Sequence, residues 1–174
     1  IASQAAFFRH DLQEIDRLLN KMERLSDVVA VPAITAKRQI FRGWMAARAG
    51  DTGQIDAVTQ GLNALRGFGV LEDVPFYADV EADVVAASGK VDAAIGPLNE
   101  AIEEARSTGL TYWLPELLRR KAILSGGIVA AQAFDEGFEV AMGQNAQTLV
   151  LRNVASRLDL GLAIAPELIL RLGE

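Results

Sequence analysis

The sequence predicts an all-α protein, and more narrowly a right-handed α-solenoid of antiparallel helical hairpins. Three segments of one pattern recur at a spacing near 40 residues, which is typical of a helical repeat array. Hydrophobic residues make up 51% of the chain and aromatic residues only 6%, so small side chains let helices approach closely. The chain has no sustained alternation of apolar and polar residues bounded by turn residues, so no β-strand is predicted. The recurring segments are residues 60–69, 100–109 and 136–145.

Each segment has a small residue before a large apolar one and ends in a residue that tolerates a left-handed backbone. The small residues are Gly61, Ala101 and Gly137, and the terminal ones are Gly69, Gly109 and Asn145. In the second helix of each predicted hairpin, a large residue stands three positions before the place where the helices cross, at Leu19, Val58, Leu98 and Phe134. The first, or leading, helices hold small residues at the equivalent places, which are Gly43, Ala82 and Ala122. Pro75 and Pro115 follow two segments at the same offset, which suits the first turn of a new helix. The pattern predicts close helix crossings within each hairpin.

The first helices follow from apolar spacing at a period of 3.6 residues. Residues 11–27 form one, with Asp11 as its N-cap. Its apolar face comprises Leu12, Ile15, Leu18, Leu19, Met22 and Leu25. Residues 33–49 form the next helix, which ends at a turn over residues 50–53, and residues 54–67 return antiparallel to it.

The later helices repeat this arrangement. They are predicted over residues 74–88, 91–107, 111–125, 128–143 and 146–160, followed by a short closing helix in the apolar tail after Pro166. Turns fall at residues 88–90 and at Gly126–Gly127. Pro97 lies inside a predicted helix and is expected to kink it or to remove one of its hydrogen bonds.

The chain is expected to be a single repeat domain, cut from a longer polypeptide. Residues 1–9 correspond to a shortened leading helix, and the chain does not begin with Met. The repeat units are predicted over residues 1–29, 30–69, 70–109, 110–144 and 145–174.

Composition narrows the function. The net charge of −6 and pI near 4.9 argue against nucleic-acid binding by this segment. There is no Cys, which excludes disulfides and thiolate chemistry and fits a reducing, cytoplasmic compartment. No apolar run reaches the roughly 18 residues of a membrane span.

Several strings resemble a known family. The small and large residue pattern is similar to tetratricopeptide repeats, although these units are longer than the usual ~34 residues. Residues 43–51 (GWMAARAGD), 61–66 (GLNALR), 116–119 (ELLR) and 145–152 (NAQTLVLR) resemble the C-terminal repeat region of bacterial multidomain AAA-ATPase regulators. The resemblance covers nearly the whole chain, but Leu118 replaces the usual His of the third string. It implies that a cyclase or DNA-binding transcriptional activator domain accompanies this region.

Candidate chemical groups are few. His10 is the single His, so a zinc site is not expected and a solvated or capping role is favoured. Two acidic clusters are interpreted mainly as solvated helix faces, at Glu100, Glu103 and Glu104 and at Asp79, Glu81 and Asp83. The basic run Arg119–Lys121 could clamp an anion or pair with neighbouring acids. The aromatic residues Trp44, Tyr77, Tyr112 and Trp113 on or near the leading helices are more often core than exposed.

The expected function is non-catalytic scaffolding, without metal or cofactor. In stacked hairpins the leading helices line the concave face, which would bind a protein, a peptide or other domains of the same polypeptide. The candidate binding residues are Lys37, Trp44, Arg48, Asp79, Asp83, Glu116, Arg119 and Arg120. Two alternatives are a small-molecule sensor and a self-associating module, in which exposed apolar ends of the array form a homodimer.

Overall fold

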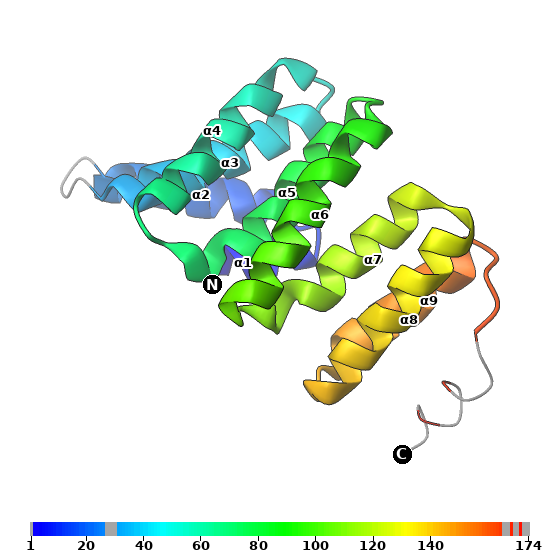
Figure 1. Ribbon diagram of the computed structural model, residues 1–174. Helices are drawn as coiled ribbons and strands as arrows, with labels where there is room; N and C mark the ends of the chain where they lie inside the picture. The colour runs from blue at the N-terminus through cyan, green and yellow to red at the C-terminus, as the bar shows by residue number, and fades with distance from the viewer. Residues whose placement is uncertain (1, 27–30, 165–167, 169–170, 172–174) are drawn as a thin grey trace. The chain divides into compact units, whose positions relative to one another are not determined.

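The computed structural model describes residues 2–26, 31–164, 168 and 171, which form the helices of Figure 1. These described residues contain nine α-helices, three short 3-10 helices and no strand. The prediction of an all-α fold is therefore confirmed. None of the helices in this part of the chain has both the length and the apolar character needed to cross a membrane.

The helices match the predicted ranges to within three residues at each end. The α-helices are α1 (Ala2–Phe8), α2 (Leu12–Ser26), α3 (Pro32–Arg48), α4 (Ile55–Gly67), α5 (Val74–Ala87), α6 (Val91–Thr108), α7 (Leu114–Ser125), α8 (Gly127–Gly143) and α9 (Gln147–Asp159). The 3-10 helices are η1 (Thr52–Gln54), η2 (Leu71–Asp73) and η3 (Thr111–Trp113). Helix α7 begins later than predicted because η3 occupies its first three positions and Pro115 lies in its first turn. The predicted closing helix lies largely outside the described residues.

Residues with a left-handed backbone end the helices where the sequence places them. The dihedral φ is 73° at Gly69, 73° at Gly109 and 54° at Asn145. After α4, the N–H of Val70 donates to the carbonyl of Leu65 at 3.0 Å, which satisfies a carbonyl that the helix leaves open. Pro97 does not end α6, which continues to Thr108.

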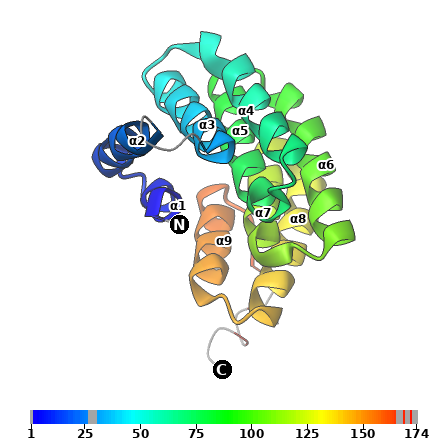
Figure 2. The ribbon, with the colours of Figure 1, turned by 90° about the vertical axis from the view of Figure 1, so that its left-hand side faces the viewer.

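The chain divides into two compact units, Ile1–Ala94 and Ile95–Glu174. In the first, helices pack in chain order from α1 to α5, and α3 also contacts α5. Figure 2 shows α3 and α4 as a pair lying side by side. Aromatic rings join α1, α3 and α5: the ring centroid of Phe7 lies 5.0 Å from that of Trp44 and 5.2 Å from that of Phe76. Trp44 and Tyr77 are thus core residues, as favoured from the sequence.

Small residues at the predicted crossings bring helices close together. A Cβ atom on Gly61 of α4 would lie 2.7 Å from Ile40 Cγ1 of α3, which leaves no room for a side chain. In the second unit, a Cβ atom on Gly137 of α8 would lie 3.3 Å from Leu118 Cβ of α7. The alanines at the other repeat positions are also buried, namely Ala82, Ala101 and Ala122. The small and large pattern therefore encodes packing within hairpins.

In the second unit, α7 packs on α8, α8 packs on α9, and α7 also contacts α9. Phe134 packs with alanines of α7 and α8, and Phe138 packs with Val150 of α9 and with Leu168. Helix α6 begins in the first unit and continues in the second.

Two expectations about exposure are wrong. Asp79, Glu81 and Asp83 do not form a solvated face, because every residue of α5 from Val74 to Val85 is buried. Their exposed fractions are 1%, 7% and 8%. Leu12, assigned to the apolar inner face of α2, is the first residue of the helix and is 44% exposed. By contrast, Glu100 and Glu103 of α6 are exposed, as expected.

Candidate functional site

Three of the predicted binding residues form one cluster in the first unit. Trp44 of α3 is completely buried, and its Nε1–H donates to Asp83 Oδ2 of α5 at 2.8 Å. The Arg48 guanidinium lies 3.8 Å from the same carboxylate oxygen and 5.9 Å from the centre of the Trp44 ring. This cluster joins two leading helices, and only Arg48 presents an exposed side chain to a partner.

Lys37 forms a separate contact near the start of α5. Its ammonium donates to Asp73, and Gln4 Nε2 of α1 donates to the other oxygen of that carboxylate at 3.0 Å. Asp73 therefore connects α1 and α3 to the beginning of α5. Further along α5, Asp79 is buried, and Glu81 accepts a hydrogen bond from the Thr59 hydroxyl of α4.

Glu116 and Arg119 lie in a buried ionic network of the second unit. Arg119 donates to both carboxylate oxygens of Glu116, at 3.0 and 2.9 Å, in a fork-like arrangement. Arg152 of α9 donates to the same carboxylate at 3.0 Å, and Arg119 also donates to the Ser156 hydroxyl at 2.9 Å. Two guanidinium groups thus share one carboxylate whose residue is 1% exposed. Arg120, next along α7, is half-buried.

The network determines the charge state of Glu116. Burial raises the pKa of its carboxyl, but the charge of Arg119 and the hydrogen bonds from Arg119 and Arg152 outweigh burial. The pKa of Glu116 is therefore lowered from its ordinary value of 4.5. Glu116 and Arg119 both bond to α9, to Arg152 and Ser156 respectively, and so connect α7 to α9.

His10 lies at the turn between α1 and α2, where its φ is 55°. Its exposed ring is 6.3 Å from the ring centroid of Phe7. Within the described ranges, no group of three or more His, Asp or Glu side chains is arranged to hold a metal ion.

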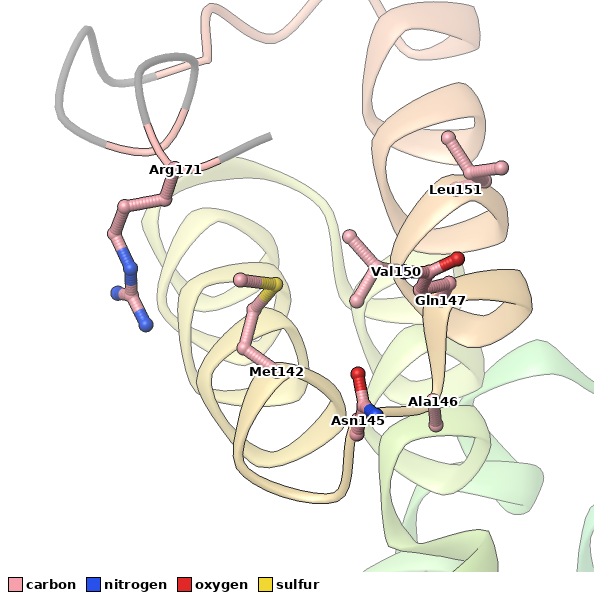
Figure 3. A pocket seen from close by; sticks show the side chains of 7 residues that line it. All are labelled: Met142, Asn145, Ala146, Gln147, Val150, Leu151 and Arg171. Atoms are coloured by element: carbon pink, nitrogen blue, oxygen red, sulfur yellow. The ribbon is translucent and has the colours of Figure 1, made fainter. Parts of the chain in front are cut away.

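The structure also contains a cavity that the sequence did not indicate, at the turn between α8 and α9. We call it the α8–α9 cavity, and its volume is about 360 Å³. Figure 3 shows Met142 and Arg171 on one side of it and Val150 and Gln147 on the other. Among the described residues, those that line it are Met142, Asn145, Ala146, Gln147, Val150, Leu151 and Arg171. The cavity combines an apolar wall with two side-chain amides.

The chain conformation at this turn positions the amides. Asn145 has a left-handed backbone, and the N–H of Ala146 donates to the carbonyl of Ala141 at 2.9 Å. This arrangement ends α8 at Gly143, and α9 begins at Gln147 after three intervening residues. Gln144 ties the turn to η3, because its Nε2 donates to the carbonyl of Thr111 at 2.7 Å.

Two shallower depressions adjoin the α8–α9 cavity. One is lined by residues 145–149, and the other lies between residues 109–112, Gln144 and Ala146. Tyr112, which lines the second, is 44% exposed. All three depressions share Ala146 and therefore lie next to one another at the turn between α8 and α9.

One sequence signal could have indicated this surface. Leu149, Val150 and Leu151 are consecutive apolar residues, and a helix cannot turn three consecutive side chains to one face. Val150 is buried whereas Leu151 is 64% exposed. Arg171 could not be placed from the sequence because it comes from the tail, where it pairs with Glu139 at 2.5 Å.

Comparison with known proteins gives one relative without an assigned activity. The chain is 32% identical over 166 residues to the uncharacterized protein R02095 of Rhizobium meliloti (strain 1021). The match covers 92% of this chain but only 16% of the relative, so the chain spans about a sixth of that protein's length. No family model matches the chain, and no solved structure matches it.

Proposed function

We propose that this chain is a non-catalytic protein-interaction module and that the α8–α9 cavity and its adjoining depressions bind a peptide segment of a partner protein. The observation that carries the proposal is the lining of the cavity, which combines apolar side chains with two amides. Binding sites for peptides and small ligands generally combine an apolar surface with a few polar groups that fix orientation.

Each part of the lining suits a different part of a peptide. Met142, Val150 and Leu151 provide an apolar wall for one hydrophobic side chain, and Met adapts its shape readily. The amides of Asn145 and Gln147 each offer a donor and an acceptor, which matches the C=O and N–H of a peptide group. Arg171 closes one side, held over the Phe138 ring at 5.8 Å.

The proposal includes the wider architecture expected from the sequence. We propose that the hairpins stack as a right-handed repeat array in a cytoplasmic regulator, with an ATPase, cyclase or transcriptional activator domain in the same polypeptide. The repeated crossings at Gly61 and Gly137 support a repeat array. The partner segment then belongs either to another protein or to those domains.

A small-molecule sensor is the second candidate function. The volume of about 360 Å³ lies in the range of ~300–1,000 Å³ that is usual for small-molecule sites. A small apolar ligand with a hydrogen-bonding group would use the same lining. A peptide would in addition cover the depression beside Tyr112, so the two candidates differ in whether Tyr112 contributes.

The test is selection from a random-peptide display library on the 174-residue chain, followed by fluorescence anisotropy with an enriched peptide. The informative variant is Asn145→Gly, because glycine keeps the left-handed backbone and removes only the amide side chain. We expect peptide affinity to fall about tenfold, as for loss of roughly 1.4 kcal/mol of hydrogen bonding.

The matched control is Gln132→Ala, which removes an exposed amide elsewhere on α8 and should leave peptide affinity unchanged. Tyr112→Ala should weaken peptide binding and leave binding of a small molecule unchanged. Enrichment of no peptide, or equal affinity of Asn145→Gly and the unmodified chain, would refute the proposed site.

A further inference from the structure

Helix α9 has an unusual distribution of side chains around its axis. Its outer face carries Leu151, Ala155 and Leu158, which we call the leucine face. Leu151 is 64% exposed and Leu158 is 56% exposed. The opposite face buries Asn153 and Arg157, which are 2% and 7% exposed. Apolar side chains at i, i+4 and i+7 normally face a core, so here they indicate a surface that is covered by something else.

The buried polar residues fix the rotation of α9 about its own axis, with the leucine face outward. Asn153 Nδ2 donates to the carbonyl of Phe134 at 3.1 Å, and Arg157 Nε donates to the carbonyl of Ala163 at 2.7 Å. Arg157 also forms an ion pair with Asp135 of α8. A rotation that buried the leucine face would break these bonds and leave buried polar groups unsatisfied, which is costly.

We infer that the leucine face packs against the same face of a second copy of this chain, with the two α9 helices antiparallel. Leu151 belongs both to the leucine face and to the apolar wall of the α8–α9 cavity, whereas Asn145 and Gln147 of the cavity are not part of the leucine face. The inference does not depend on peptide binding. Homodimers with two-fold symmetry are the commonest oligomers, and they require a self-complementary surface.

The spacing of the leucine face is self-complementary. Ala155 lies between the two leucines, four residues after Leu151 and three before Leu158. With the two-fold axis beside Ala155, Leu151 of each copy lies opposite Leu158 of the other. The small alanine at the centre permits close approach of the helices, at roughly 8 Å between axes.

Charge selects the antiparallel orientation. Arg152 and Asp159 each follow one of the leucines directly, so both lie on the same flank of α9. In an antiparallel pair equal flanks meet, which puts Arg152 of one copy opposite Asp159 of the other. In a parallel pair this flank would meet Gln147 and Val154, neither of which is charged.

The ionic network of Glu116, Arg119 and Arg152 also favours the antiparallel orientation of the two α9 helices. Glu116 is a single carboxylate shared by the guanidinium groups of Arg119 and Arg152. The Arg152 side chain is 28% exposed and can still receive an anion from outside. Asp159 of the second copy is an exposed carboxylate at the required position along the helix.

The first test maps orientation by cross-linking, which is direct because the chain has no Cys. We expect a Leu151→Cys chain mixed with a Leu158→Cys chain to form the mixed cross-linked dimer with a short bismaleimide. A Ser125→Cys chain, altered at an exposed position outside α9, should not cross-link. Cross-linking of Leu151→Cys with itself in preference to Leu158→Cys would overturn the antiparallel pairing.

The second test measures association by sedimentation velocity over a wide concentration range. Leu158→Glu should weaken dimerisation at least about tenfold, because it puts a charge in the apolar interface. Ile128→Glu is the matched control, since Ile128 is an even more exposed apolar residue, at 76%, on α8. Asp159→Lys should also weaken the dimer by removing the cross-pair with Arg152.

A strictly monomeric unmodified chain, or equal association of the Leu158→Glu and Ile128→Glu chains, would overturn the inference. Circular dichroism of each variant confirms that folding is retained, which is expected at exposed helix positions. None of these outcomes bears on Asn145→Gly, so failure of the dimer and failure of the peptide site are distinguishable.

Discussion

Replacing Glu116 by glutamine should strongly destabilise the second unit. Glutamine has nearly the same volume and keeps one acceptor oxygen, so Glu116→Gln removes mainly the negative charge. It leaves the buried Arg119, 7% exposed, without the carboxylate that now accepts its two hydrogen bonds at 2.9 and 3.0 Å. Removing one partner of a buried ion pair costs about 3–5 kcal/mol. We expect about 3 kcal/mol, because the Arg152 side chain, 28% exposed, can turn toward water.

The loss should depend on pH with a definite sign. The pKa of Glu116 is lower in the folded chain than its ordinary value of 4.5. The carboxylate therefore contributes its full stability above pH 4.5, and this contribution is lost as the pH falls through the folded-state pKa. The difference in unfolding free energy between the unmodified chain and Glu116→Gln should be largest near neutral pH and should shrink in acid.

The assay is urea denaturation followed by circular dichroism, repeated from neutral pH to below 4.5. Hydrogen exchange of peptides from α7 and α9 assigns the loss to the second unit. The matched control is Glu103→Gln, whose side chain is 70% exposed and pairs with Arg106, and which should cost less than about 1 kcal/mol. A loss below about 1 kcal/mol for Glu116→Gln, or a loss that does not change with pH, would refute this account of the network.

Two further predictions concern the first unit and the helix crossings. Gly61→Ala should destabilise by about 1–3 kcal/mol in denaturation experiments, because its Cβ would lie 2.7 Å from Ile40 Cγ1 and 3.0 Å from the Ala36 carbonyl oxygen. Gly67→Ala, at the last residue of the same helix, meets no atom within 4 Å beyond its chain neighbours and the helix's own backbone and should change stability by less than about 1 kcal/mol, and the opposite order would contradict the packing argument. Trp44→Phe should cost about 1–3 kcal/mol, since it removes the Nε1–H donor 2.8 Å from the buried Asp83 carboxylate. A Trp44→Phe chain with an unchanged urea midpoint would show that this hydrogen bond contributes nothing.

The helices could be predicted from the sequence because local chemistry determines their ends. Glycine and asparagine adopt left-handed backbones that other residues avoid, and proline lacks the N–H that the first turn of a helix does not use. Gly69, Asn145 and Pro115 therefore marked ends and starts correctly. The Glu14 N–H, bonded to Asp11 Oδ1 at 3.0 Å, confirms the predicted cap of α2.

The candidate site could not be predicted in the same way because it depends on which face of a helix is covered. The acidic residues Asp79, Glu81 and Asp83 are expected to be solvated because they are charged, yet every residue of α5 from Val74 to Val85 is buried. Conversely, the leucines of α9 have the spacing of a buried face, yet they are exposed. A helical period identifies a face but does not show what packs against it.

Some of the polar residues that the sequence suggested as binding groups form hydrogen bonds between helices of one unit. Trp44 of α3 bonds to Asp83 of α5, and Arg152 of α9 bonds to Glu116 of α7. The contact of Gly61 of α4 with Ile40 of α3 is, by contrast, apolar and non-directional. Apolar contacts alone would let successive hairpins slide past each other, whereas directional hydrogen bonds to a buried carboxylate require one distance and one orientation. The two kinds of interaction are therefore complementary: small residues determine how closely α4 approaches α3 and α8 approaches α7, and buried polar pairs determine how α5 is placed on α3 and α9 on α7.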